Sequence, residues 1–429
     1  MAKEKKINNV NGEEFSDITL LAEVTEVLSK NKNSSVNRTA EFDVQYPTGF
    51  LPLDYKNGQK ITVSTAQGSF SYDSVGIVDG SINMFIGRSG CGKSTIVTQI
   101  AANIVRGFSN GLIFIDLLEG GVMAKRNEIL TGFSPYECER RIKIRNAGIN
   151  IESVYAQIKA IHDVKIEHED KYRYDTGLFD SNGRPIYKFQ PTVYIIDSIP
   201  MLTSFNLSQE EELSGQMSTT ANTKQIAMLF KRIGQLLKEA NIIIIAINHI
   251  TQKIEINPFK HTKSQNKYLK QDESLPGGVT PLYLANMVFR LDDGDKLTSD
   301  KEFGIEGCYV TVSNVKSRAA TSGMSSAVDL IFNYSIGFDP ELSLYVMLKK
   351  AGRINGAGAY LYIGDRSDMK FSQKQFKSKL IDDPEFLNVF VSECTNYLTN
   401  ELDKLEEMCR QKSSNATALI IDRIRNMSK

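Results

Sequence analysis

A glycine-rich segment at residues 87–95 constrains this chain more than any other stretch. It reads Gly-Arg-Ser-Gly-Cys-Gly-Lys-Ser-Thr, a full match to the pattern G-x-x-x-x-G-K-[ST]. The stretch before it, residues 81–86, predicts a short buried strand, and apolar residues recur at helical spacing from Ile96 to Ile104 after it. A strand, a glycine-rich loop and a helix in this order form a cradle for phosphate. The sequence therefore predicts a nucleotide triphosphate site on an α/β fold.

The residue types in this loop have separate tasks. Glycine at positions 87, 90 and 92 allows backbone conformations and a close approach that a Cβ would block. The amide groups of the loop and of the helix N-terminus then point at the β-phosphate. Lys93 can reach the β- and γ-phosphates, and the hydroxyl of Ser94 is placed to hold Mg²⁺. We assign these loop residues to nucleotide binding: Gly87, Arg88, Ser89, Gly90, Cys91, Gly92, Lys93, Ser94 and Thr95.

Composition and charge limit the other function classes. The chain has 429 residues, enough for one large domain with smaller flanking pieces. Lys plus Arg and Asp plus Glu number 51 each, so any contact with DNA has to come from local lysines rather than from net charge. The 5 cysteines form no CxxC pair, which predicts a reducing compartment and no structural zinc. With no apolar segment of signal or membrane-spanning length, we expect a soluble, cytoplasmic protein without membrane contact.

Alternating strand and helix patterns follow the phosphate loop. Continuous aliphatic runs at residues 112–115, 192–196 and 242–247 predict strands buried on both faces. Two of these runs end in an acid, Asp116 and Asp197. Acids at strand ends near a phosphate loop indicate a parallel sheet with its ligand at the carboxyl edge.

The flanking regions differ from this core. Helical spacing at residues 15–28 and a strand pattern at 42–46 predict an N-terminal arm that mediates oligomerisation, and residues 171–190 predict an exposed inserted hairpin. After residue 288 we expect antiparallel strands that extend the sheet. The predicted domains are an arm at 1–46, a core at 47–337 and a small, mostly helical C-terminal domain at 338–429.

Three motifs follow the phosphate loop in order. The first is Asp-Leu-Leu-Glu at residues 116–119, the second is Ile-Ile-Asp-Ser at 195–198, and the third is Ile-Asn-His at 247–249. This order resembles the RecA recombinases, most of all the phage branch typified by UvsX. The resemblance spans about residues 41–360. It includes a T-G-x-x-x-L-D segment, the segment that leaves the second DNA loop and the K-S-R of the UvsX-type branch, which correspond to Thr48–Asp54, Gly277–Phe289 and Lys316–Arg318.

The resemblance implies a RecA-like P-loop ATPase core, with ATP and Mg²⁺ as cofactors. It implies an ATP-dependent recombinase that forms helical filaments on single-stranded DNA. Such a protein pairs the bound strand with homologous duplex DNA and exchanges strands in recombination and repair. Its partners would be DNA, further copies of the chain, recombination mediators and single-strand-binding proteins. The setting would be the host cytoplasm if a phage encodes it.

The resemblance also assigns roles at the γ-phosphate. Glu119 would be the general base or would orient the attacking water, but two residues separate it from Asp116 and the family has one. We expect Glu119 rather than Asp116 to take this role, with a one-residue bulge restoring the geometry. Asp197 would hold Mg²⁺ through water, together with Ser94.

Further cationic or polar side chains would complete the site. His249 would sense the γ-phosphate and relay its state into the loop that follows. Lys316 and Arg318 would reach across a subunit interface to the neighbour's γ-phosphate, which makes hydrolysis depend on assembly. Arg126 falls near the position where the family stacks an aromatic ring on adenine, and a guanidinium can stack in the same way.

Two loops are candidates for contact with DNA. The first, about residues 204–221, contains three consecutive glutamates, so only its polar end at 214–220 is suited to phosphate. The second, residues 251–276, interleaves lysines with aromatic side chains, the combination that sequence-independent binding of single strands requires. We assign to DNA these residues of the second loop and its exit: Lys253, Phe259, Lys260, Lys263, Lys267, Tyr268, Lys270, Gly277 and Gly278.

The sequence leaves two other functions open. A ring-shaped RecA-fold helicase, a hexamer, shares the core, but it would need an additional primase-binding or origin-type domain that this chain is too short to hold. A non-catalytic paralogue would bind ATP and load or regulate another recombinase. The shifted spacing of Glu119 keeps that alternative open.

Overall fold

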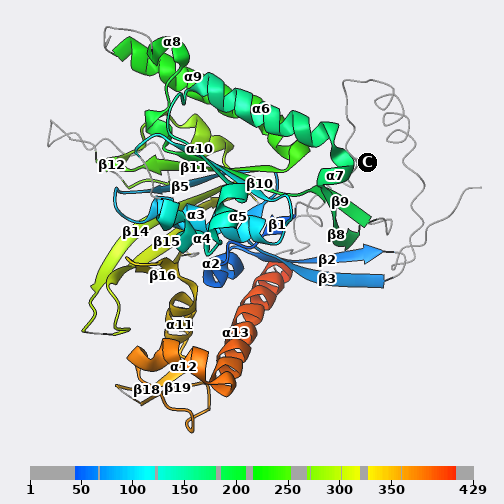
Figure 1. Cartoon of the computed structure of the whole chain (residues 1–429). Helices are drawn as coiled ribbons and strands as arrows, with labels where there is room; N and C mark the ends of the chain where they lie inside the picture. The colour runs from blue at the N-terminus through cyan, green and yellow to red at the C-terminus, as the bar shows by residue number, and fades with distance from the viewer. Residues whose placement is uncertain are drawn as a thin grey trace, which may run out of the picture. The chain divides into compact units, whose positions relative to one another are not determined.

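The computed structural model describes residues 44–65, 68–120, 124–179, 185–208, 216–252, 268–270, 272–300, 302–318, 327–358 and 360–411 (Figure 1). The helix predicted at residues 15–28 lies outside these ranges. So do Lys253, Phe259, Lys260, Lys263 and Lys267 of the predicted DNA loop. The assignments made for these residues stay predictions.

A nine-stranded sheet lies at the centre of the described chain (Figure 1). In spatial order its strands are β17 (Gly337–Asp339), β16 (Ala327–Asn333), β15 (Gly307–Ser317), β14 (Met287–Leu297), β5 (Ile82–Gly87), β11 (Ile242–His249), β10 (Thr192–Asp197), β6 (Leu112–Leu117) and β7 (Ile142–Arg145). Neighbours from β14 to β7 run parallel, and neighbours from β17 to β14 run antiparallel. The prediction of an α/β fold whose mostly parallel sheet is extended by antiparallel strands is confirmed.

Helices bury both faces of the parallel part of the sheet. α3 (Lys93–Arg106) packs on one face, and α6 (Ile151–Glu167) and α9 (Gln216–Ala240) pack on the other. Successive residues of β11 alternate between the two sides, the odd-numbered ones toward α3 and the even-numbered ones toward α6 and α9. Because side chains of a strand point to opposite faces in turn, a strand between two helical layers needs an unbroken aliphatic run. This explains the sequence of residues 242–247.

Shorter elements surround this core. The remaining helices are α2 (Leu51–Lys56), α4 (Ala124–Thr131), α5 (Pro135–Arg141), α7 (Glu169–Tyr172), α8 (Phe205–Ser208), α10 (Thr280–Leu284), α11 (Pro340–Lys350), α12 (Phe376–Asp382) and α13 (Pro384–Gln411), with 3₁₀ turns η1 (Ile199–Met201) and η2 (Gln373–Gln375). The remaining strand pairs are β1 (Gln45–Tyr46) with β4 (Ile77–Val78), β2 (Gln59–Thr65) with β3 (Gly68–Ser74), β8 (Arg173–Phe179) with β9 (Pro185–Phe189), β12 (Thr251–Gln252) with β13 (Glu273–Ser274), and β18 (Ile354–Ala357) with β19 (Tyr360–Ile363). The pair β8–β9 confirms the predicted hairpin. Within the described ranges, no helix is long and apolar enough to cross a bilayer.

The segment after β17 has an aromatic cluster of its own. Tyr345 of α11 contacts Phe371 and Phe376, and Phe376 in turn contacts Phe386 and Phe390 of α13. All five side chains are buried. Aromatic pairs in such edge-on and tilted arrangements add about 0.5–1.5 kcal/mol each beyond the burial of their area. The helices predicted for this region therefore pack around their own apolar centre.

Helix α13 also returns to the N-terminal part of the core. It packs against α2 and against β2 of the first hairpin (Figure 1). Lys60 of that hairpin donates to Asp403 of α13 at 2.6 Å. The end of the described chain is thereby fastened to a segment that precedes the phosphate loop.

Candidate nucleotide and DNA site

The loop between β5 and α3 requires glycine at three positions. Gly90 and Gly92 both have a φ of +84°, a conformation that side chains with a Cβ rarely adopt. A Cβ at Gly92 would lie 2.9 Å from a ring carbon of Phe338, and a Cβ at Gly87 would lie 2.6 Å from the carbonyl oxygen of Leu291. The loop backbone is therefore bare and closely supported, as a phosphate cradle must be.

Lys93, the first residue of α3, turns its side chain back into the loop. Its Nζ donates to the carbonyl oxygens of Gly87 and Arg88 at 3.0 and 2.6 Å. Burial lowers the pKa of this ammonium, and nearby negative groups, among them Asp197 and Glu119, oppose the shift. A cation held by neutral carbonyls at a helix N-terminus is suited to take phosphate oxygens.

Asp197 ends β10 directly opposite the start of α3. Its carboxylate is buried and accepts a hydrogen bond from the hydroxyl of Ser94. Burial raises the pKa of Asp197, and the Ser94 hydroxyl acts against that rise. Both residues, with Arg126 of α4, line a cavity of about 110 Å³ beside the loop. A hydroxyl and a carboxylate at this spacing fit a hydrated Mg²⁺, which binds proteins through one or two side chains and keeps several waters.

The described residues contain no group of three or more His, Cys, Asp and Glu side chains that could hold a metal ion. A cation at Ser94 and Asp197 would therefore take its other ligands from a nucleotide and from water. This is the donor set that Mg²⁺ with ATP uses.

Glu119 follows β6 at the same edge of the sheet and contacts residues at the ends of β10 and β11. The hydroxyl of Ser198, which follows β10, donates to Oε1 of Glu119. Nε2 of His249, at the end of β11, lies 2.9 Å from the same oxygen, within ion-pair distance but without hydrogen-bond alignment. Because β11, β10 and β6 are consecutive in the sheet, their carboxyl ends bring these three side chains together beside Gly87.

Asp116, the alternative to Glu119, is held elsewhere. Arg145 forms a bidentate pair with its carboxylate at 2.8 and 2.7 Å, and the hydroxyl of Tyr194 donates to it at 2.5 Å. The odd-numbered neighbours Ile115 and Leu117 pack on the α3 side of β6, so Asp116 faces the opposite side. The two-residue spacing therefore separates the acids onto different faces, and Glu119 is the one on the side of the phosphate loop.

Lys316 and Arg318 lie at the opposite edge of the sheet from Gly87. In the strand register, Lys316 pairs with Val288, and Val288 pairs with Met84 near the start of β5. Gly87 ends β5 and pairs with Leu291, so the loop leaves the sheet at the other end of these strands. Within one chain, these two cations are not brought to the phosphate loop.

Both cations are fixed on helix α10. Lys316 Nζ donates to the carbonyl oxygens of Leu282 and Tyr283 at 2.8 and 2.7 Å. Arg318 donates to Tyr283 at 2.6 Å. Carbonyls at a helix C-terminus favour positive charge. The exposed side chains of Val279 and Tyr283 lie on the same short segment.

Arg126 and the described part of the predicted DNA loop are the remaining candidate residues. Arg126 donates to the carbonyl oxygen of Ser335 at 2.6 Å, which leaves its predicted stacking on adenine without direct support. Gly277 and Gly278 have φ values of +81° and +85°, so they are required for the backbone of the loop exit. Tyr268 is partly buried against the α6 and α9 side of the core.

Some contacts in this region could not be predicted from the sequence. Ser198 is separated from Glu119 by 79 positions, so no local spacing connects them. Arg145 and Tyr194 likewise reach Asp116 from two other strands. Only the position of Ser198 directly after a strand-end acid could have drawn attention to it.

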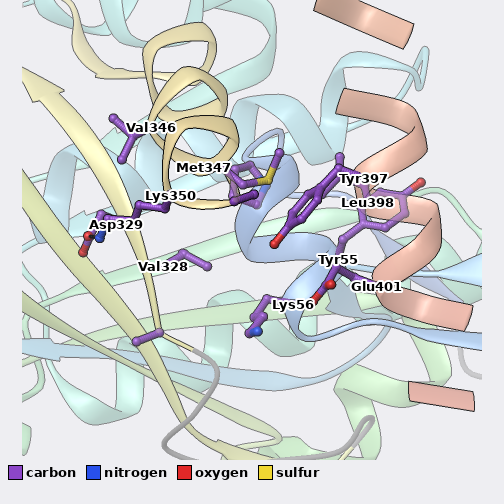
Figure 2. Close-up of a pocket in the computed structure, with 13 residues that line it drawn as sticks. Tyr55, Lys56, Val328, Asp329, Val346, Met347, Lys350, Tyr397, Leu398 and Glu401 are labelled. Carbon is purple, nitrogen blue, oxygen red and sulfur yellow. Dashed lines mark hydrogen bonds and ion pairs between the residues drawn. The ribbon is translucent and has the colours of Figure 1, made fainter. Parts of the chain in front are cut away.

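A second cavity, of about 280 Å³, lies away from the loop, between α13, α11, α2 and β16 (Figure 2). Tyr55, Met347 and Tyr397 are among the side chains that line it, and none of its lining residues belongs to the phosphate loop. Asp329 and Lys350 on its wall pair with each other. The cavity lies where α13 packs against α2 and α11.

No protein-family model matches the chain, and no curated protein is significantly similar to it. The resemblance to a recombinase family thus rests on the ordered motifs of the sequence.

Proposed function

We propose that this chain is an ATP-dependent DNA recombinase of the RecA type, which assembles on single-stranded DNA and pairs it with a homologous duplex. One observation carries the proposal: Glu119, Ser198 and His249 meet at the sheet edge that also holds Lys93. A carboxylate that is held at the mouth of a phosphate loop is what hydrolysis of a triphosphate requires. His249 contacts this carboxylate and leads into the second loop, as coupling between ATP and a second ligand requires.

The side chains at this edge divide the work of phosphoryl transfer. ATP, when bound, would supply the phosphoanhydride bond, and Mg²⁺ would neutralise negative charge on its phosphates. Lys93 would donate to phosphate oxygens, and Ser94 and Asp197 would hold the hydrated cation. Glu119 orients a water molecule and accepts its proton, while the Ser198 hydroxyl keeps the carboxylate in place.

The opposite-edge position of Lys316 and Arg318 supports action between subunits. A cation at one edge of a sheet can meet a phosphate loop at the other edge only if it belongs to another copy of the chain. Such a head-to-tail contact is heterologous, and it generates rings or helical filaments. The two cations would stabilise charge that develops on the γ-phosphate of the neighbour.

The attachment of the second loop supports coupling to DNA. β12 begins two residues after His249, and β13 brings the chain back beside it. A change at His249 therefore reaches the base of the loop that carries the predicted DNA lysines. Because Glu119 lies at the site, we favour a hydrolysing enzyme over a non-catalytic paralogue.

The test measures ATP hydrolysis with and without single-stranded oligothymidine, followed by a strand-exchange assay. We expect slow hydrolysis by the protein alone, clear stimulation by the oligonucleotide and no turnover by Lys93→Ala. Absence of both stimulation and strand exchange would overturn the proposal. Electron microscopy with a non-hydrolysed ATP analogue separates the helicase alternative, because a recombinase forms helical filaments and a helicase closed rings.

A further inference from the structure

Arg290 joins two acidic side chains where the second loop returns to the sheet. Its guanidinium donates to both carboxylate oxygens of Glu273 at 2.6 and 2.8 Å. It also donates to both oxygens of Asp292 at 2.7 and 2.8 Å. The side chains of Arg290 and Glu273 are only 7% and 1% exposed. A planar fork with four such bonds holds one orientation, and we call Arg290, Glu273 and Asp292 the Arg290 cluster.

Glu273 fixes the returning end of the loop to its outgoing end. It lies in β13 and pairs with Gln252 of β12, and Ser274 pairs with Thr251. The backbone amide of Lys270 also donates to the Glu273 carboxylate, at 2.8 Å. The Glu273 carboxylate therefore links Lys270 to β13, the strand that pairs with β12 and closes the second loop.

Arg290 also lies next to the phosphate loop, because its strand β14 pairs with β5. In β14 it pairs with Ile86 of β5, and Leu291 pairs with Gly87. A Cβ at Gly87 would lie 2.6 Å from the Leu291 carbonyl oxygen, so the two backbones are in contact. The amide of Ile250, directly after His249, donates to the Gly87 carbonyl at 3.0 Å. One short stretch of β14 thus contacts both loops. Leu291 contacts Gly87 of the phosphate loop, and Arg290 holds Glu273 at the base of the second loop.

Stability alone does not explain an ion pair at this place. The cost of removing two charges from water largely offsets their attraction, so a buried pair contributes little net stability compared with apolar side chains. In some proteins such a pair instead fixes a single register between the segments that it joins. The segments joined here are the two that the proposed function requires to communicate.

We propose that Arg290 is a positioning residue, which acts through Glu273 to keep the base of the second loop in register with Gly87 and His249. The nucleotide state at the phosphate loop is then transmitted to the loop as a displacement of β12 and β13. The inference rests on the proposed function, because it assigns the second loop to DNA. It adds a residue that touches neither nucleotide nor DNA.

The first arm of the test compares wild type with Glu273→Gln, Arg290→Lys and the double variant. Each is assayed for hydrolysis of ATP with and without oligothymidine. We expect basal turnover to stay within about twofold, while stimulation falls on the order of tenfold in Glu273→Gln. Arg290→Lys keeps the positive charge but not the planar guanidinium, so its stimulation by oligothymidine should lie between those of wild type and Glu273→Gln. The double variant should lose no more of this stimulation than the more impaired single variant, because the two residues act as one unit.

The matched control is Lys377→Gln, which breaks an ion pair with Asp339 of β17 and Glu341 of α11, and β17 lies three strands away from β14 in the sheet. It should lower the melting temperature to a similar degree and leave the ratio of stimulated to basal turnover unchanged. An equal loss of that ratio in the control would reduce Arg290 to a general structural role.

The second arm does not depend on DNA. Hydrogen–deuterium exchange is measured for peptides that cover 250–252 and 272–276, with and without Mg²⁺ and a non-hydrolysed ATP analogue. We expect the nucleotide to change exchange there in wild type but not in Glu273→Gln. If oligothymidine stimulates no wild-type hydrolysis, the proposed function fails, and this arm still decides the positioning role. Wild-type behaviour of Glu273→Gln in the exchange arm would refute that role.

Discussion

Oε1 of Glu119 lies 2.9 Å from Nε2 of His249. Glu119 follows β6 and His249 ends β11, with β10 between these two strands in the sheet. His249 leads straight into the strand pair that closes the second loop. A ligand that displaces one of them must disturb the other. If the proposed function holds, this contact links Glu119 to the base of the second loop.

Glu119→Gln tests which acid acts on water. The variant keeps its size but cannot accept a proton, so we expect kcat for ATP hydrolysis to fall on the order of 10²–10⁴-fold. Equilibrium binding of a fluorescent ATP analogue should stay close to wild type, since Lys93 and the glycine loop are intact.

Asp116→Asn is the matched comparison. Its carboxylate belongs to a pair with Arg145, so its loss should cost about 3 kcal/mol of the free energy of unfolding and leave kcat nearly unchanged. Urea denaturation and steady-state kinetics measure both quantities. The opposite result, with Asp116→Asn inactive and Glu119→Gln active, would reverse the assignment.

Ser198→Ala removes the hydroxyl that donates to Glu119. We expect kcat to drop about tenfold, because the carboxylate loses one of the two contacts that orient it. The dissociation constant of the nucleotide should not change, and single-turnover kinetics separate the two effects. A loss of nucleotide binding without a loss of kcat would argue against an orienting role.

A mixture of two inactive proteins tests whether the site is shared. Lys93→Ala lacks a working phosphate loop, and Lys316→Ala lacks the cation from the opposite edge. In a random equimolar assembly, about one quarter of head-to-tail contacts combine an intact loop with an intact cation, so about one quarter of wild-type turnover should return. Each variant alone should be inactive with DNA, and Lys316→Ala should still bind ATP as a monomer.

No recovery in that mixture would place Lys316 outside the site of the neighbour. Weaker ATP binding by the Lys316→Ala monomer would indicate instead that the residue supports its own nucleotide site.

Asp54 should make stability depend on pH. Its carboxylate is buried and accepts from the Thr48 amide at 3.0 Å, and burial raises its pKa from 3.8 to about 7. The folded state therefore binds more protons than the unfolded state between these values. The stabilising contribution is full below about pH 4 and is lost as the pH rises through 7, at up to about 1.4 kcal/mol per pH unit.

Asp54→Asn removes this titration. The free energy of unfolding of the variant, relative to wild type, should rise between pH 4 and pH 7, as measured by urea denaturation at several pH values. A difference that is independent of pH would mean that Asp54 does not titrate in this range.

The sequence predicted the parts of the fold that depend on local pattern. Residues 242–247 identify a doubly buried strand because every side chain meets a helical layer, and residues 87–95 identify the loop because each glycine has a local backbone task. The hairpin at 59–74 was not predicted, since its alternation contains few large apolar side chains. The sequence favoured Glu119 over Asp116, but it could not show how each acid is held, because that depends on Ser198, Arg145 and Tyr194 from other parts of the chain.

The position of Lys316 shows the same limit at a larger scale. Its motif was visible, but the sheet edge on which it lies follows from the order and direction of β14, β15 and β5. The pairing of β14 with β5 joins segments far apart in the chain, and no local pattern encodes it.

That position has a consequence for any linear assembly of this chain. If every complete site takes its loop from one copy and its cations from the next, a row of subunits has one fewer site than it has members. The copy at one end presents an uncompleted phosphate loop, and the copy at the other end presents Lys316 and Arg318 with nothing to reach. The two ends are chemically different, so growth and loss of subunits should proceed at different rates from each end, and the row has a direction.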